Sequence, residues 1–449
     1  MEALEQTKDN HEELRQLLNG GRMRTARVMV NSLHPSEVAR LLESLPRKKR
    51  SMLWELVDSE IDGDVLVEVS DEVRDGLIQG MKTADLIAAA DGMEADDLAD
   101  LLIDLPETVT QEVLQSLDKQ DHDRVQQVLA YDEESAGGLM NVDIVTVRPD
   151  VTLEVVARYL RFVGDITDGT DSIFVVNRDN RYIGSLFLSR LLTGAPDEMV
   201  ANVMSTEKTP IPANTPSTQV VWEFENRDLL SAPVVDDDYR VLGRITVDDV
   251  VDVIRDEAEH SLMSAAGLDE EDDMFAPVFQ SAARRALWLG VNLFTAFVAA
   301  GVVEQFQTAL DKVVLLAVLM PVVPSMGGVA GTQSLTIITR AIALGQINKD
   351  NAAWILRKEL MVGVLNGIGW AIIVSLFTYW WFEEWVIGGI IGAAMIINLF
   401  VAALAGFSIP LILKRLNIDP ALGGGVVLTT VTDVIGYSAF LGLGAAFLL

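Results

Sequence analysis

One carboxylate lies deep inside an apolar segment of this 449-residue sequence. Asp433 stands in the run GGGVVLTTVTDVIGYSAF, with mostly apolar residues on both sides. A carboxylate at that depth in a bilayer is costly unless it is paired, hydrated or bound to an ion. Helical spacing places Gly425, Thr429 and Gly436 beside it, a small and polar stripe that suits a water-lined pore or a close helix contact. Asp433 is therefore the first candidate for cation binding.

A second apolar segment has the same character. Ser325, Gly328, Thr332 and Thr336 fall on one helical face. Packing through small residues is the simpler interpretation for the glycines, but no basic residue inside the apolar segments can neutralise Asp433. Mg²⁺ prefers oxygen ligands and keeps several waters while using one or two carboxylates. Because each chain supplies one intramembrane Asp, we expect a homodimer with its pathway between subunits.

A run of acids precedes the apolar half. In VDDVVDVIRDEAEHSLMSAAGL, the residues Asp248, Asp252, Asp256 and Glu259 recur at helical spacing. Like charges at this spacing repel one another. A solvated helix face is the ordinary interpretation of such a run. Here the helix leads toward the apolar half and few basic partners are available, so a cation-stabilised arrangement is favoured.

Charge divides the chain into two halves. Residues 284–449 hold nine Lys or Arg and eight Asp or Glu, out of 34 and 66 in the whole chain, so residues 1–283 carry a net charge of −33. Such a region repels phosphate, which argues against nucleic-acid binding. The absence of cysteine excludes disulfides and thiolate metal sites. Four scattered histidines make a His-rich metal site improbable.

Five apolar stretches after Arg284 are long enough to cross a bilayer. We place them at about 286–303, 313–338, 360–382, 385–413 and 421–449. The polar start, MEALEQTKDNHEELRQ, has no signal-peptide core, so we expect a cytoplasmic N-terminus. Five spans then put the C-terminus outside. We expect the protein in the plasma (inner) membrane. Lys312 is the single basic residue on the outer side in this arrangement, and the inner side has Arg284, Arg285, Arg340, Lys349, Arg357, Lys358, Lys414 and Arg415.

The acidic half contains a duplication. SIFVVNRDNRYIGSLFLSRLL at 172–192 matches SAPVVDDDYRVLGRITVDDVV at 231–251 with a shift of 59 residues. Each copy reads as strand, polar turn, strand and helix, an order that resembles a tandem pair of cystathionine-β-synthase (CBS) domains. Such modules often bind adenine nucleotides, so ATP is a candidate ligand. Residues 1–135 read as helical hairpins, with Ser36 and Asp96 as helix caps.

The predicted fold class is a multidomain membrane protein. An all-α superhelical N domain occupies 1–135, and the two CBS domains of α+β type occupy 136–200 and 201–252. An acidic connecting (plug) helix follows over 253–283. The transmembrane domain of five helices occupies 284–449.

This arrangement resembles the MgtE family of magnesium channels over essentially the whole chain. The most specific marks are the GG-x-x-G-x-QS-x-T run that starts at Gly327 and the TDV-x-G run around Asp433. The MxxDDLADLL and AGGLM segments of the acidic half add to the resemblance. It implies a Mg²⁺ channel or transporter rather than an enzyme, closed when intracellular Mg²⁺ binds the acidic domains.

The resemblance also implies site residues. Asp433 would bind hydrated Mg²⁺ at the dimer axis, in a pore lined by Gly328, Thr332, Thr336, Gly425 and Thr429. Asp419 would join the acidic helix through Mg²⁺, with Glu257 as its partner. Further regulatory ions would use Asp96, Asp100, the Gly138 carbonyl, Asp228, Asp249 and Asp252.

Two departures from the family pattern stand out. Thr332 occupies a position where members often carry Asn, which keeps an oxygen but loses an amide. Acids expected near the end of the connecting helix fall at His260 and Ser261, so either Glu259 substitutes for them or that ion is missing.

Three other functions are compatible with the residues. The chain could transport another divalent cation such as Co²⁺ or Mn²⁺, whereas the acidic pore argues against an anion. An intramembrane enzyme with an aspartyl mechanism needs two carboxylates, which a dimer would supply. A pure sensor would use its spans only as an anchor.

Overall fold

A computed structural model describes residues 14, 16–17, 20–90, 93–103, 105–164, 166, 169–265, 268, 274–343, 345–416 and 418–449. The chain divides into two compact units. The first comprises Met1–Ala258 with Asp273–Phe275, and the second comprises Glu259–Asp272 with Ala276–Leu449. The division falls inside one helix, α15 (Val247–Ala265).

The N-terminal part of the first unit is helical, as predicted, throughout its described residues. Its apolar positions recur at helical spacing and meet in one core that extends from Leu14 to Val128. Its helices are α2 (Met23–Val30), α3 (Pro35–Glu43), α4 (Arg47–Trp54), α5 (Asp62–Glu68), α6 (Asp71–Ile78), α7 (Thr83–Ala90), α8 (Ala95–Ile103), α9 (Glu107–Ser116) and α10 (Lys119–Val128).

The two helix caps expected in this part are wrong. α3 begins at Pro35, and its capping residue is His34, whose ring accepts a hydrogen bond from the Ser36 backbone N–H. Glu37 completes a capping box by accepting from the His34 backbone N–H at 3.1 Å. Asp96 lies inside the first turn of α8, which begins at Ala95. Asp96 is therefore a buried helical residue and not the cap.

The duplicated segments form two matching three-stranded sheets. Both have a parallel pair followed by an antiparallel pair, in the orders β1-β2-β3 and β4-β5-β6. The register shifts at Val175/Val176 in one sheet and at Val234/Val235 in the other. The elements are β1 (Thr146–Val147), α11 (Leu153–Val163), β2 (Ser172–Val176), β3 (Tyr182–Phe187), α12 (Leu188–Thr193), α13 (Val200–Val203), β4 (Ile211–Pro212), α14 (Ser217–Arg227), β5 (Ser231–Val235) and β6 (Val241–Thr246).

The acidic helix α15 follows β6 without a loop. It begins at Val247, inside the range expected for the second CBS domain, and ends at Ala265. The Asp249 carboxylate accepts hydrogen bonds from the backbone N–H and the hydroxyl of Thr246, at 2.8 and 2.9 Å. These bonds satisfy a donor at the start of the helix. Asp249 is therefore fixed directly to the end of the second CBS sheet.

Among the described residues of the second unit, five helical segments are long and apolar enough to cross a membrane, as predicted. They are Ser281–Glu304, Val314–Ala343, Ala352–Phe382, Trp385–Arg415 and Gly423–Leu448. The second segment is interrupted after α18 at Pro321, which has no N–H to continue the helix. The helices are α16 (Val278–Glu304), α17 (Gln307–Lys312), α18 (Val314–Leu319), α19 (Val322–Ala343), α20 (Ala352–Phe382), α21 (Trp385–Arg415) and α22 (Pro420–Leu448).

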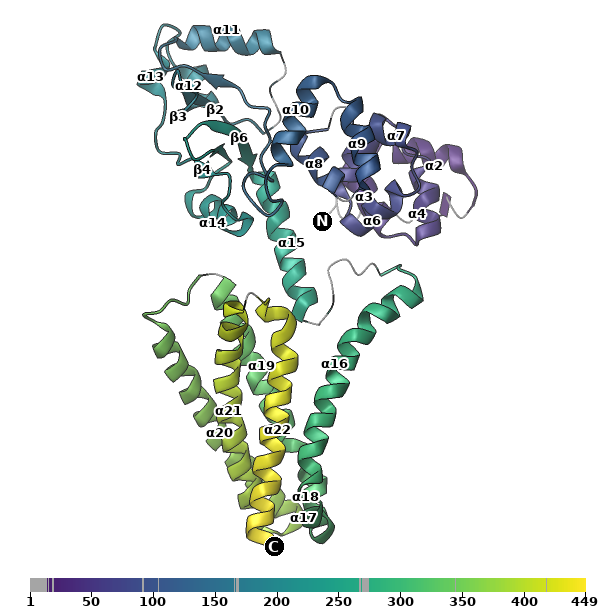
Figure 1. Cartoon of the computed structure of the whole chain (residues 1–449), viewed down its shortest axis with the longest axis vertical. Coiled ribbons are helices and arrows are strands. Elements are labelled where there is room, and N and C mark those ends of the chain that lie inside the picture. Colours follow the sequence, from purple (N-terminus) through teal and green to yellow (C-terminus); the bar gives the residue numbers. More distant parts are fainter. Residues whose placement is uncertain are drawn as a thin grey trace. The chain divides into compact units, whose positions relative to one another are not determined.

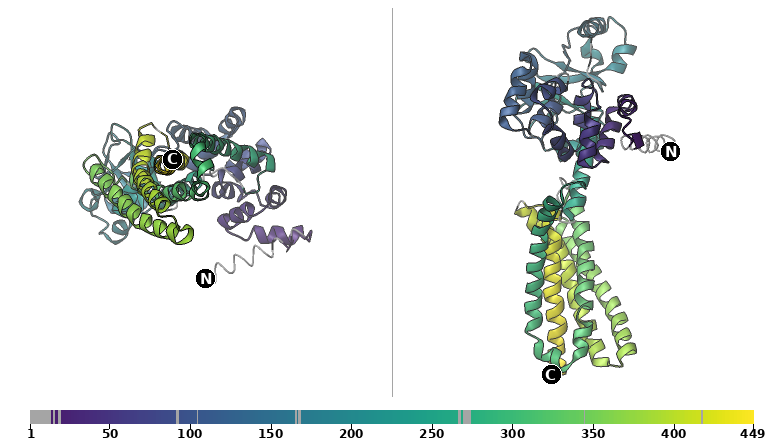
Figure 2. Two further views of the ribbon diagram at one scale, coloured as in Figure 1. Left: turned by 90° about the horizontal axis from the view of Figure 1, so that it is seen from below. Right: turned by 90° about the vertical axis from the view of Figure 1, so that its right-hand side faces the viewer.

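Helices α19, α21 and α22 form the centre of this bundle. α20 lies along α21, and α16 contacts α22 (Figure 1). The short helices α17 and α18 pack at one end of the bundle, close to the C-terminus, in a core that includes Leu316 and Phe440. Large apolar side chains of α16 and α20, such as Phe294 and Leu365, point outward, as lipid-facing residues do. Figure 2 shows the long helices running side by side.

Candidate cation sites

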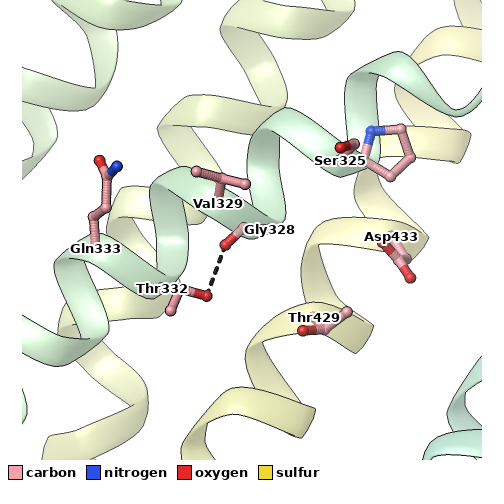
Figure 3. Close-up of a pocket in the computed structure, with 8 residues that line it drawn as sticks. Ser325, Gly328, Val329, Thr332, Gln333, Thr429 and Asp433 are labelled. Carbon is pink, nitrogen blue, oxygen red and sulfur yellow. Dashed lines mark hydrogen bonds between the residues drawn. The ribbon is translucent and has the colours of Figure 1, made fainter.

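A pocket of about 490 Å³ opens between α19 and α22 in the membrane unit. Asp433 and Thr429 of α22 line one side, and the remaining lining residues come from α19 (Figure 3). The α19 residues are Pro324, Ser325, Gly328, Val329, Thr332 and Gln333. The carboxylate identified from the sequence therefore faces a cavity.

The hydroxyl groups of the pocket present oxygen lone pairs to it. The Thr332 hydroxyl donates to the Gly328 carbonyl at 2.9 Å, and the Thr429 hydroxyl donates to the Gly425 carbonyl at 2.9 Å. Each proton is thus used within its own helix, which leaves the oxygen as an acceptor. No Lys, Arg or His is among the lining residues. A carboxylate with surrounding oxygen acceptors suits a cation that carries its water, because water donates to such groups.

The predicted pore residues divide into two groups. Gly328, Thr332 and Thr429 line the pocket, but Thr336 and Gly425 are not among its lining residues. Gly425 contributes through the carbonyl that accepts from Thr429. Gln333, which was not among the predicted pore residues, also lines the pocket beside Thr332.

The membrane unit contains a buried carboxylate that sequence reasoning missed. Glu359 of α20 is 5% exposed, and the Ser334 hydroxyl of α19 donates to it at 2.9 Å. Neither residue is among those that line the pocket. Glu359 directly follows Arg357 and Lys358 in the sequence, and it lies in the first part of the apolar segment Ala352–Phe382.

In the first unit, carboxylates of α8 and α15 come together. Asp96 is 7% exposed, and its Oδ1 is buried with no hydrogen-bond partner in the part of the chain that the structure describes. Burial, with smaller contributions from the charges of Asp97, Asp249 and Glu94, raises the pKa of Asp96 well above its ordinary value. Burial, Glu94 and Asp249 likewise raise the pKa of Asp97 to about 7. We call Glu94, Asp96, Asp97 and Asp249 the α8–α15 acidic cluster.

The cluster combines residues of two domains, because α8 belongs to the N domain and α15 follows the second CBS sheet. Burial raises the pKa of Asp249 to about 6, against the opposing effect of its hydrogen bond from the Thr246 backbone. Glu94 accepts a hydrogen bond from the side-chain amide of Asn141, a residue between the N domain and the first sheet. Asp252 of α15 also raises the pKa of Asp97. Two of the predicted residues, Asp96 and Asp249, are thus neighbours, and sequence reasoning missed Asp97 and Glu94.

Asp100 has a different acidic neighbour. Burial, followed by the charge of Glu133, raises the pKa of Asp100 to about 7. The backbone of Glu133 packs against Gly138, where an added Cβ would approach within 2.7 Å. Gly138 therefore lies in the same neighbourhood as Asp100. Asp228, in contrast, is an exposed left-handed residue at the end of α14, with φ 49°.

Asp419 has an unexpected neighbour. Its Oδ2 lies 3.3 Å from Nε2 of His260, near the end of α15. Both residues belong to the second unit, whereas the expected partner Glu257 belongs to the first and is exposed. The pairing of Glu257 with Asp419 stays a prediction. His260, which stands where the family pattern predicts an acid, is thus the residue that contacts Asp419.

Three or more Asp, Glu or His side chains do not converge on one point anywhere in the described ranges. The carboxylates are close enough to affect one another's pKa values, but they do not form a closed coordination shell.

Comparison with known proteins decides the family. The model of the divalent cation transporter family MgtE matches residues 320–443, and the model of the MgtE intracellular N domain matches 33–134. The CBS domain model matches twice, at 136–195 and 200–256. This chain belongs to the MgtE family.

Similar MgtE proteins extend over nearly the whole chain. The magnesium transporter MgtE of Bacillus subtilis is 26% identical over 96% of this chain and 96% of its own. That of Thermus thermophilus is 28% identical over 97% of this chain and 98% of its own. A crystal structure of the cytosolic domain of the Mg²⁺ channel MgtE in complex with ATP is 28% identical, with a TM-score of 0.50. The match covers 54% of the present chain and 99% of the crystallised chain. The resemblance stated from the sequence is therefore confirmed.

The MgtE membership favours a multi-pass membrane transporter over the alternatives. The family model that covers the pocket describes a divalent cation transporter. Neither the intramembrane enzyme nor the pure sensor gains support from these matches.

Proposed function

We propose that this MgtE protein conducts Mg²⁺ through the pocket between α19 and α22. One observation supports this most directly, namely that Asp433 faces a cavity otherwise lined by hydroxyl, amide and apolar groups, with no basic residue among them. A single negative charge attracts a divalent cation, and the hydroxyl oxygens of Thr332 and Thr429 accept hydrogen bonds from its water shell. The magnesium transporters that resemble this chain over nearly their whole length support Mg²⁺ as the cargo.

The test is Mg²⁺ flux into liposomes that contain the full chain. Asp433→Asn keeps the size of the side chain and removes its charge, so we expect flux to fall at least tenfold. Asp350→Asn is the matched control, because Asp350 lies in the loop before α20 and outside the pocket. Undiminished flux in Asp433→Asn would reject this pathway. Mn²⁺ and Co²⁺ in parallel assays distinguish a magnesium pathway from one for other divalent cations.

We also propose that intracellular Mg²⁺ closes the channel by binding the α8–α15 acidic cluster. Carboxylates that are buried together favour either protonation or a bound cation. The raised pKa values of Asp96, Asp97 and Asp249 support this, because bringing these groups together without a proton or cation is unfavourable. Mg²⁺ would favour a closed cytoplasmic arrangement, and its loss would let the acids repel one another.

Limited proteolysis of the full chain tests this regulation. We expect slower digestion of the first unit in millimolar Mg²⁺ than in a chelator. Asp97→Asn removes one charge of the cluster and should reduce the difference between the two conditions. Asp197→Asn, an exposed acid between α12 and α13, is the control. Equal digestion of the wild type with and without Mg²⁺ would contradict the proposal.

A homodimer remains our proposal for the assembly in the lipid bilayer. One Asp433 per pocket supports it, because a two-fold axis would bring two such carboxylates to one pathway. Native mass spectrometry of the protein in lipid nanodiscs measures the assembly directly. A monomer that conducts Mg²⁺ would rule the dimeric pathway out.

We further propose that the N-terminus is cytoplasmic and the C-terminus is outside, in the plasma (inner) membrane. The excess of basic residues on one side of the five segments supports this orientation. Because the chain has no cysteine, single cysteines can be labelled cleanly. An impermeant maleimide should label Lys312→Cys in intact cells but not Lys349→Cys. The reverse pattern would invert the topology.

ATP is a proposed ligand of the CBS pair. The similar cytosolic domain that was crystallised in complex with ATP supports this. Calorimetric titration of the full chain with ATP measures the binding, and the absence of heat at millimolar ATP would remove ATP from the mechanism.

A further inference from the structure

A buried amide lies directly behind the wall of the pocket. Asn398 stands in the middle of α21, within the run AAMIINLFVAAL, and it is 0% exposed. Its Nδ2 donates to the carbonyl of Val323 in α19 at 2.8 Å. Asn398 thus connects a helix that does not line the pocket to one that does.

Two glycines make room for this amide. A Cβ added to Gly327 of α19 would lie 2.1 Å from Asn398 Nδ2, and one added to Gly436 of α22 would lie 3.0 Å from it. Gly327 precedes Gly328, and Gly436 is one helical turn after Asp433, so both glycines adjoin residues that line the pocket. The amide therefore occupies the point at which α19, α21 and α22 meet.

The other end of the amide is unusual. Oδ1 of Asn398 is buried and has no hydrogen-bond partner among the residues that the structure describes. A buried acceptor without a partner is unfavourable, so an apolar residue of similar size would be the better choice for stability alone. Between apolar helices in a bilayer, small residues and polar contacts determine how closely the helices approach. An amide at this point therefore indicates a requirement for one particular spacing.

We propose that Asn398 is a positioning residue that sets the distance between α19 and α22. This distance in turn determines how well the pocket distinguishes Mg²⁺ from larger divalent cations. This inference rests on the proposed Mg²⁺ pathway. Mg²⁺ requires near-octahedral geometry, whereas Ca²⁺ accepts irregular shells of oxygen. A pocket whose walls are free to shift would lose this distinction and admit Ca²⁺ relatively more easily.

The experiment compares Mg²⁺ and Ca²⁺ fluxes of the full chain in liposomes under one gradient. Asn398→Ala is expected to lower the ratio of Mg²⁺ to Ca²⁺ flux about fivefold, the factor that corresponds to one net hydrogen bond. Asn366→Ala is the matched control, since Asn366 is an exposed residue of α20 outside the pocket, and its ratio should equal that of the wild type. If both fluxes of Asn398→Ala fall in proportion, Asn398 only supports the fold and the inference is wrong.

A double variant separates the amide from its volume. Gly327→Ala with Asn398→Ala places a methyl group close to the position of the amide nitrogen, so part of the lost volume is refilled while the hydrogen bond to Val323 is absent. We expect its flux ratio to stay low. A ratio restored to the wild-type value would assign selectivity to packing volume and overturn the role of the amide. A wild type that carries no Mg²⁺ would instead reject the proposed pathway itself.

Discussion

The charge of Asp249, at the start of α15, raises the pKa of the buried Asp96 carboxyl in α8. Asp96 belongs to the helical N domain, and Asp249 follows the last strand of the second CBS sheet. Their approach therefore couples two domains through charges that repel one another.

The stability of the cytoplasmic unit should depend on pH when Mg²⁺ is absent. Burial raises the pKa of Asp97 and Asp100 to about 7 and that of Asp249 to about 6, above the ordinary value of 3.8. Between pH 4 and pH 7 the folded state therefore binds more protons than the unfolded state, and stability falls as the pH rises through this window. Thermal unfolding in a chelator should show a lower Tm at pH 7.5 than at pH 5.

Saturating Mg²⁺ should flatten this dependence, because the metal competes with protons for the same oxygens. A Tm that rises from pH 5 to pH 7.5 in the chelator would show that the net effect of these groups has the opposite sign.

Removing one charge of the cluster should stabilise the metal-free protein. Asp97→Asn eliminates the repulsion of Asp97 with Glu94 and Asp249, and we expect a gain of about 1 kcal/mol in the absence of Mg²⁺. The same change should reduce the additional stabilisation that Mg²⁺ confers on the wild type. Chemical denaturation with and without Mg²⁺ measures both quantities, and Asp197→Asn should leave both unchanged. A loss of metal-free stability in Asp97→Asn would contradict the repulsion argument.

The hydroxyl oxygen of Thr332 should matter for transport. Thr332→Val keeps the shape of the side chain and removes the oxygen that lines the pocket, so Mg²⁺ flux should fall several-fold. Thr332→Asn restores an oxygen and should retain flux. Thr336→Val is the control one helical turn further along α19, outside the pocket lining. Equal fluxes in Thr332→Val and Thr336→Val would mean that the hydroxyl does not act on the ion.

A buried ammonium joins the two CBS sheets. Lys208 Nζ lies 2.9 Å from Asp171 Oδ2 and donates to the hydroxyls of Ser172 and Ser231, which begin β2 and β5. Lys208→Ala would leave the Asp171 carboxylate, whose side chain is 16% exposed, without its cation. We expect a loss of about 3 kcal/mol in the free energy of unfolding.

Arg181→Ala is the control for this change. Arg181 and Asp238 lie 3.8 Å apart, and both side chains are at least half exposed, so the loss should stay below about 1 kcal/mol. Chemical denaturation that follows the first unit measures both variants. Similar losses in the two would show that the buried ion pair adds no special stability.

The sequence by itself determined the architecture of this protein, because the signals involved are local. Five runs of apolar residues are long enough to span a bilayer whatever their neighbours are. The two CBS copies are 59 residues apart in the sequence, and their strands β2 and β5 begin at Ser172 and Ser231, which are also 59 residues apart. Equivalent sequences thus form equivalent sheets. Asp433 was found because an isolated charge in an apolar run has few structural explanations.

Only the tertiary structure decided which distant side chains meet. Glu94 and Asp97 join the acidic cluster because α8 packs near the start of α15, a contact that no local pattern encodes. Glu359 is buried against Ser334, and Asn398 is held between Gly327 and Gly436, because helices α19 to α22 cross at those points. Helical periodicity says which face a residue occupies, but what that face touches depends on the packing of the whole bundle.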